Sequence, residues 1–279
     1  MGLLLLVSSA FLHALWNSWV KGEKNKEAFL TIVICCATGM AWLGLLIQPA
    51  VLGTRYALNV ALLSGVFEGL YFAALAYTLG QASLSWAYAL MRGGAMILVW
   101  VGAVSLLGEK VSQAGIFGAA LIFTALWIPV FGPGQARQSR KAILSALFCA
   151  VCIAGYHISY DEALRSGISP ALLFAIALSV SAPFSLINVY VRGQQREMFA
   201  MLKKRPFLIA FAGLIVYSSF ILYLMGLQKT APGFAISLRN TSIFFALLLG
   251  TFLGEKITRI QLITCAMIFM GAILLGWGR

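Results

Sequence analysis

Two helix-length apolar runs in this sequence each contain one arginine and end in Gly-Glu-Lys. The first extends from Leu84 to Lys110 with Arg92 inside it, and the second extends from Ala231 to Lys256 with Arg239 inside it. A charged residue at the centre of a membrane span costs roughly 2.5–3.5 kcal/mol even on the mildest insertion scale. Because the chain carries this cost twice at matching positions, the pattern suggests the two halves of a duplicated membrane protein.

The composition points to lipid as the main solvent of the chain. Of its 279 residues, 61% are hydrophobic and only 10% are charged, whereas soluble domains contain about 25% charged residues. The formal net charge of +12 does not indicate nucleic-acid binding, since the basic residues lie between the apolar runs, as they do in the cytoplasmic loops of membrane proteins.

Ten apolar runs are long enough for helices that cross a bilayer, which need roughly 20 residues each. We therefore predict an all-α polytopic membrane protein with ten transmembrane helices. The expected spans are Gly2–Val20, Ala28–Ile47, Leu58–Leu79, Leu84–Leu107, Val111–Phe131, Ala142–Tyr160, Ala171–Val191, Phe207–Leu227, Pro232–Leu253 and Ile257–Trp277.

The charges of the connections predict an orientation. Most lysines and arginines follow the first, third, fifth, seventh and ninth spans, and they include the cluster Lys203-Lys204-Arg205. Cytoplasmic loops carry such an excess. We therefore expect both termini to lie outside the cytoplasm, and we expect the protein to reside in a bacterial inner (plasma) membrane.

An odd number of spans per half inverts the second half relative to the first. We expect residues 1–134 to form one five-helix repeat and residues 135–279 to form the inverted repeat, within a single membrane domain. The segment from Ala14 to Asn17 corresponds weakly to the segment from Ala154 to His157, since each places an aromatic residue before a polar one. Inverted repeats are typical of secondary transporters, which bind substrate near the midplane at the repeat interface.

These features resemble the drug/metabolite transporter superfamily, EamA type. The resemblance is carried by the ten short spans, the internal repeat, the two Gly-Glu-Lys endings, and the early stretch from His13 to Asn17 followed by Lys21. It implies a basket of two inverted five-helix repeats around a central cavity that is lined mainly by helices 1, 3, 4, 6, 8 and 9. Many relatives have a proline within the fourth and ninth helices. Here the fourth has none, and the ninth has only Pro232 at its start.

Arg92 and Arg239 are the first candidates for a substrate site. Intramembrane charges usually face a cavity, although long side chains can also reach the headgroups. With the orientation above, Arg92 is expected nearer the cytoplasm and Arg239 nearer the outside. Two cationic groups at mirrored depths would hold an anionic group of the substrate from either side in turn.

Glu68 is the acidic candidate, in the middle of the third span between Gly65 and Gly69. The two glycines form a small-residue face that lets another helix approach closely. The carboxyl group is a candidate for proton coupling or for recognition of a substrate amine. The alternative is a structural ion pair with Arg92, since buried charges are normally paired.

Further candidates are polar or aromatic residues inside apolar runs. Histidines titrate near neutral pH but also serve as hydrogen-bonding groups between helices, and tryptophan and tyrosine also form interfacial belts. These candidates are His13, Trp16, Asn17, Tyr156, His157 and Asn240. Glu109 and Glu255, by contrast, lie in helix-ending turns, so we expect structural roles for them.

Together these residues predict a secondary active transporter, without cofactor or metal, that moves a small organic metabolite by alternating access. The two arginines favour an amino acid or a related carboxylate- or phosphonate-type compound, and Glu68 makes the transport a candidate for proton coupling. One alternative is an exporter of cationic or aromatic drugs or amines. Another is a membrane-embedded enzyme or lipid-handling protein, for which Asp161-Glu162 is the nearest carboxylate pair. Membrane lipids are the other expected partners, and the chain is expected to be a monomer or homodimer.

Overall fold

The computed structural model describes residues 2–106, 112–131, 139–230, 235 and 238–277. These residues form eleven helices and no strand, which confirms the all-α class. The helices are α1 (Gly2–Gly22), α2 (Lys26–Gly44), α3 (Arg55–Gln81), α4 (Leu84–Leu106), α5 (Gln113–Phe131), α6 (Arg140–Arg165), α7 (Pro170–Val191), α8 (Gln195–Lys204), α9 (Pro206–Leu227), α11 (Ser242–Phe252) and α12 (Arg259–Trp277).

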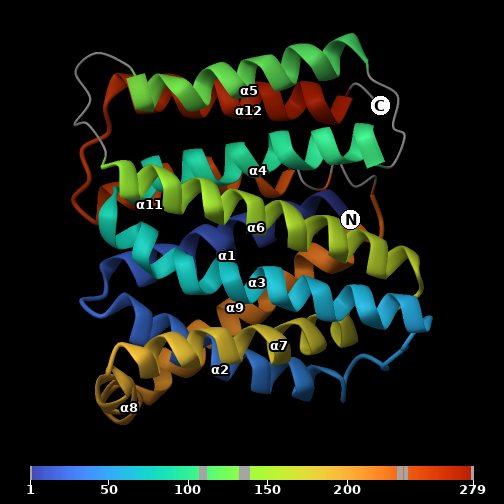
Figure 1. The fold of residues 1–279 in the computed structure, drawn as a ribbon, viewed down its shortest axis with the longest axis vertical. Coiled ribbons are helices and arrows are strands. Elements are labelled where there is room, and N and C mark those ends of the chain that lie inside the picture. Colours follow the sequence, from blue (N-terminus) through green and yellow to red (C-terminus); the bar gives the residue numbers. More distant parts are fainter. Residues whose placement is uncertain (1, 107–111, 132–138, 231–234, 236–237, 278–279) are drawn as a thin grey trace.

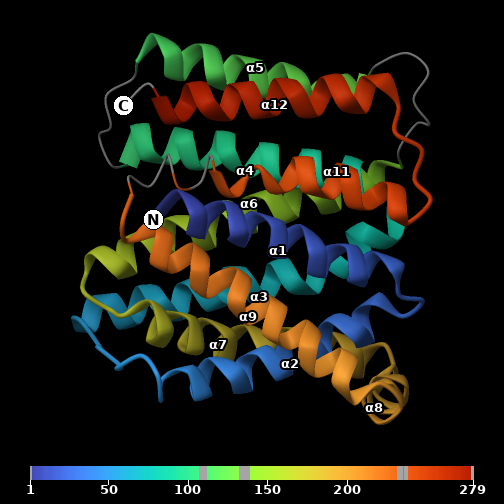
Figure 2. The same ribbon diagram turned by 180° about the vertical axis from the view of Figure 1, so that it is seen from behind.

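Most helices run roughly side by side and form an elongated stack (Figures 1 and 2). α5 and α12 lie together at one extreme of the long axis, and α2 and α7 lie at the other. The helices of the two halves of the chain interleave, because α3 packs against α6 and α7, α1 against α9 and α11, and α5 against α12. Both chain termini lie at one end of the helices, and α8 lies at the opposite end, which we call the α8 end.

Six helices are long and apolar enough to cross a membrane, namely α1, α2, α3, α6, α7 and α9. Four shorter apolar helices lie within the remaining expected spans, at Trp86–Gly102, Gln113–Ala125, Ser242–Phe252 and Arg259–Leu274. The polytopic helical fold predicted from the sequence is therefore confirmed. The count of ten membrane-spanning helices and the inverted relation of the two halves remain predictions.

The connection expected between the seventh and eighth spans contains a helix that the hydropathy pattern did not predict. This helix, α8, places Met198 in the interior and leaves Lys203 and Lys204 exposed. It is too short and too polar to register as a span, which is why a search for apolar runs overlooks it. Pro206 begins the next helix, where its missing N–H costs no hydrogen bond.

The ninth expected span, Pro232–Leu253, is interrupted. Leu238 and Arg239 are helical, Asn240 and Thr241 form a turn, and α11 begins only at Ser242. The Thr241 amide donates to the Leu238 carbonyl at 3.1 Å, and the Thr241 hydroxyl donates to the same carbonyl at 2.7 Å. Asparagine and threonine offer the backbone such local alternatives to the helix, so the chain breaks here without an internal proline.

The glycines of α3 allow the close helix contact that the sequence predicts. A Cβ atom built on Gly65 would lie 2.7 Å from the Ala177 carbonyl oxygen, and one on Gly69 would lie 3.0 Å from the Cα atom of Ser181. Both neighbours are backbone atoms of α7. α3 and α7 therefore touch at backbone distance, which fixes the position of Glu68 between the two glycines.

The second Gly-Glu-Lys ending is a helix-terminating turn, as expected. Gly254 has φ +80°, a left-handed conformation that favours glycine, and the Glu255 amide donates to the Gly250 carbonyl at 3.0 Å. The Glu255 carboxylate also accepts a hydrogen bond from the Leu84 amide at 2.6 Å, so it caps the start of α4. The first ending, Gly108-Glu109-Lys110, lies outside the described residues.

Polar contacts join several elements at the α8 end. Arg205 forms an ion pair with Glu23 at 2.9 Å, and Arg192 forms one with Glu27 at 3.1 Å. The Lys21 ammonium group donates to two backbone carbonyls at the end of α3, at 2.8 and 2.6 Å. These contacts tie the connection between α1 and α2 to the segments on both sides of α8.

Candidate functional site

A cluster of buried polar side chains lies inside the helix stack, centred on His13. Arg92 of α4 contacts Nε2 of the His13 ring through its Nη2 atom, and Nη2 of Arg239 lies 3.2 Å from Nδ1 of the same ring. The exposed fractions are 0% for His13, 1% for Arg92 and 0% for Arg239. One imidazole ring therefore lies between two guanidinium groups, one from each half of the chain. We call these three residues the arginine cluster.

Helical spacing brings further polar groups of α1 to the cluster. Ser9 lies one helical turn before His13, and its hydroxyl accepts a hydrogen bond from Nη1 of Arg239 at 2.8 Å. The same hydroxyl donates to the Ser219 carbonyl of α9 at 2.6 Å. Nη1 of Arg239 also lies 3.4 Å from that carbonyl. α1 and α9 thus hold the second arginine in place jointly.

Aromatic rings enclose the Arg239 side of the cluster. The guanidinium carbon lies 4.7 Å from the ring centroid of Phe220 and 4.1 Å from that of Tyr223. The His13 ring has the Trp16 ring at 5.1 Å and the Phe220 ring at 5.6 Å, both edge to face. Cation–π contacts in a desolvated site contribute about 2 kcal/mol or more, so the rings offset part of the cost of burying the charge.

Neither arginine of the cluster has a carboxylate partner among the described residues. The described ion pairs join Arg165 to Asp161, Arg192 to Glu27 and Arg205 to Glu23, all toward the surface. Nη1 of Arg92 and Nε of Arg239 are buried and lack a hydrogen-bond partner within the described part of the chain. Two neighbouring buried cations without an anion are costly, so a negatively charged group would be stabilised between these donors.

The His13 ring cannot satisfy both arginines. A neutral imidazole carries one N–H donor and one lone-pair acceptor, and guanidinium groups only donate. Both ring nitrogens face guanidinium N–H groups, so only one of the two contacts is a hydrogen bond at any time. The other guanidinium N–H needs a different acceptor.

A second polar group lies near the cluster. The Tyr160 hydroxyl donates to Oε2 of Glu68 at 2.9 Å, while Oε1 of Glu68 has no partner among the described residues. Tyr156 connects the two groups, since its ring lies 5.4 Å from the Tyr160 ring and its hydroxyl lies beside Arg92. That hydroxyl has no partner in good hydrogen-bond geometry among the described residues.

The structure bears on three expectations about the arginines. Snorkelling to the headgroups does not occur, since both side chains are buried. Both guanidinium groups meet at one imidazole ring, and their mirrored depths in the membrane remain a prediction. The alternative of an ion pair between Glu68 and Arg92 is not formed, because Glu68 is bonded to Tyr160 instead.

The other candidates divide into members and neighbours of the cluster. Trp16 packs on His13. Asn17 donates to the His13 carbonyl within its own helix at 2.8 Å. His157 pairs with the Tyr223 hydroxyl at 2.8 Å, and Asn240 lies buried in the turn before α11. The sequence reasoning missed Ser9, Ser219, Phe220 and Tyr223. The sequence pattern that could have identified these residues is the four-residue spacing of Ser9 to His13 and of Ser219 to Tyr223.

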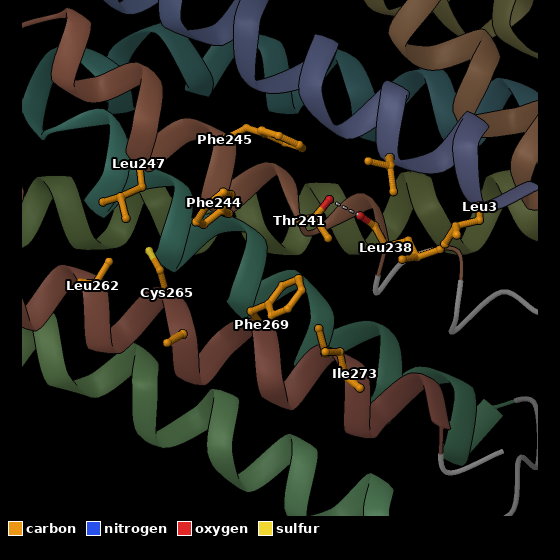
Figure 3. Close-up of a pocket in the computed structure, with 13 residues that line it drawn as sticks. Leu3, Leu238, Thr241, Phe244, Phe245, Leu247, Leu262, Cys265, Phe269 and Ile273 are labelled. Carbon is orange, nitrogen blue, oxygen red and sulfur yellow. Dashed lines mark hydrogen bonds between the residues drawn. The ribbon is translucent and has the colours of Figure 1, made fainter.

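A separate apolar cavity of about 970 Å³ lies beside α12 (Figure 3). Phe244 and Phe245 of α11, Phe269 of α12 and residues from the start of α1 line it. Leu238 and Thr241, which flank Arg239 and Asn240, also line it. Because its lining is almost entirely hydrocarbon, this cavity offers no partner for a charged substrate.

Comparison with known proteins agrees with the polytopic helical fold. Residues 140–277 match the model of the EamA-like transporter family. A solved structure described as "Crystal structure of protein" is similar over 99% of this chain and 98% of its own, with a TM-score of 0.69 and 16% identity. At that identity the likeness shows the fold alone. No curated protein matches the sequence. Residues 140–277, which form α6 to α12, thus match the EamA-like transporter family, and the resemblance to the membrane transporters of the drug/metabolite superfamily is confirmed.

Proposed function

We propose that the protein is a secondary active transporter that moves a small organic anion across the membrane by alternating access and binds it at the arginine cluster. One observation carries this proposal: Arg92 and Arg239 are buried next to each other, share one imidazole ring, and have no carboxylate partner among the described residues. A carboxylate or phosphonate group would supply the missing acceptor.

The origin of the two arginines supports the alternating-access part of the proposal. Arg92 comes from α4 in the first half, and Arg239 precedes α11 in the second half. An anion that accepts hydrogen bonds from both would hold the two halves together. Hydrogen bonds to charged groups contribute about 1.5–3 kcal/mol each, which is enough to favour one arrangement of the halves over another.

Among compounds with a carboxylate group, amino acids fit the surroundings best. The carboxylate group would bind the arginines, and Oε1 of Glu68, which lacks a partner among the described residues, would accept a hydrogen bond from the ammonium group. Tyr156 lies between the two. A purely cationic substrate is disfavoured, since two buried guanidinium groups would repel it.

A thermal-shift screen of the purified protein tests the proposal. We expect carboxylates, amino acids and phosphonates to raise the melting temperature more than amines or nucleosides, because a ligand at 100 times its Kd stabilises the folded state by about 2.7 kcal/mol. Arg92→Gln and Arg239→Gln should abolish the response. Arg165→Gln is the matched control, since Arg165 is a half-exposed arginine that pairs within α6.

Two results would contradict the proposal. One is a response to amines that exceeds the response to anions in the wild-type protein. The other is an anion response that survives in both Arg92→Gln and Arg239→Gln. The melting temperatures of both variants without ligand report whether they fold.

A further inference from the structure

We infer that His13 is the proton-binding group of this site, and that its ring takes up one proton when the arginine cluster binds an anion. The inference rests on the proposed function, since it concerns the same site. It assigns the coupling to a residue of α1 rather than to Glu68, the coupling candidate suggested by the sequence.

The geometry of the arginine cluster excludes a doubly protonated ring. Both ring nitrogens of His13 face N–H donors, Nε2 toward Arg92 and Nδ1 toward Arg239. A protonated imidazole would turn both nitrogens into donors and would oppose an N–H to an N–H at each contact. It would also place a third positive charge among two others in a water-excluded site.

A bound anion removes both obstacles. Its oxygen atoms accept the N–H groups of Arg92 and Arg239, so the lone pair of the ring is released from its guanidinium donor. The proton that arrives from solvent forms a new N–H bond at that nitrogen, and the ring then donates to the anion as well. The two arginines with a neutral ring carry two positive charges, and the same cluster with one anion and one proton also carries two. The charge of the interior is therefore unchanged by binding.

The groups around the ring favour His13 over its neighbours for this role. α4 contributes Arg92 and Tyr88, whose hydroxyl donates to the His13 backbone carbonyl at 3.0 Å. α6 contributes His157, which is tied to a tyrosine hydroxyl of α9 and touches neither arginine in the described contacts. From the segment before α11 comes Arg239, and from α9 comes the uncharged ring of Phe220. Among the described residues, His13 is the titratable side chain that contacts both guanidinium groups.

Proton counting in detergent solution tests the inference. The probes are propionate and propanesulfonate, which carry a single negative charge from about pH 6 to about pH 9. The measurements are the pH change of a weakly buffered solution on mixing, and the apparent Kd from thermal shifts across that pH range. For the wild type we expect about one proton taken up per anion bound, and an apparent Kd that rises about tenfold per pH unit toward alkaline pH.

The variants locate the proton. His13→Gln and His13→Asn keep one donor and one acceptor but cannot titrate, so they should bind the probes without proton uptake and with a pH-independent Kd. His157→Gln is the matched control, since it removes the other buried histidine and should retain the uptake.

The outcomes separate the inference from the proposed function. Absence of probe binding in the wild type overturns the proposed function. Binding without proton uptake, or uptake that persists in either folded His13 variant, overturns the inference alone. Loss of the uptake in Glu68→Gln but not in the His13 variants would also overturn it and assign the proton to Glu68.

Discussion

At the residue scale, Arg92 and Arg239 are recognisable in the sequence because each is a charge inside an apolar run. Ser9 and Ser219 are not, since serine is common in membrane helices and each becomes significant only where α1 meets α9. The sequence also cannot reveal that His13 lies between the arginines. Its position depends on the packing of three segments that are far apart along the chain.

Tyr160 and Glu68 give a prediction at this scale. Tyr160→Phe removes the donor to Oε2, so neither oxygen of a fully buried carboxyl group has a partner among the described residues. Leaving a buried group unsatisfied costs about 1–3 kcal/mol, and we expect a lower melting temperature in detergent. Tyr190→Phe makes the same chemical change at an exposed position and should leave the melting temperature unchanged. Equal melting temperatures for the two variants would show that the Tyr160 hydrogen bond contributes nothing.

At the scale of helices, apolar run length and small-residue spacing predict most of the structure. The close contact of α3 with α7 follows from Gly65 and Gly69, and it is confirmed. The turn at Asn240 and Thr241 was not predicted, because the breaking signal expected in this kind of helix is proline and the chain uses side-chain hydrogen bonds instead. α8 was missed because a ten-residue amphipathic helix leaves no apolar run.

Two glycines of α3 give a matched pair of substitutions. Gly65→Ala adds a Cβ atom at 2.7 Å from a backbone oxygen of α7, whereas a Cβ on Gly80 meets nothing within 4 Å. Overpacking costs typically about 1–3 kcal/mol, while alanine in an exposed helical site gains about 0.5–1 kcal/mol over glycine. We expect Gly65→Ala to melt at a lower temperature than the wild type, and Gly80→Ala at the same or a higher temperature. A Gly65→Ala protein as stable as Gly80→Ala would contradict the close approach of α3 and α7.

At the scale of the whole molecule, the chain is an interleaved stack whose ends differ in chemistry. The α8 end carries the ion pairs of Glu23 and Glu27 with arginines beyond α7, and its lysines include Lys203 and Lys204. The opposite end carries both termini. The excess of basic residues predicts that the α8 end faces the cytoplasm. The sequence could predict this orientation because it depends on loop charge and not on packing.

Labelling of single introduced cysteines tests the orientation. Lys203 of α8 and Ala50, in the connection between α2 and α3, are both exposed. α8 and that connection lie at opposite ends of the helices (Figure 1). We expect a membrane-impermeant maleimide to label Ala50→Cys in intact cells and Lys203→Cys only in inverted vesicles. The parent protein is the control for the five native cysteines, which lie within helices. The reverse labelling pattern would invert the orientation and place both termini in the cytoplasm.

The unchanged charge of the arginine cluster has a consequence for energetics in the cell. A membrane potential acts on every charge that moves across it, with about 2.3 kcal/mol per elementary charge at 100 mV. An anion that crossed alone would be driven out of a cell whose interior is negative. An anion that crosses with the proton on His13 carries no net charge, so the voltage neither drives nor opposes it. Its direction then depends only on the concentration gradients of anion and proton.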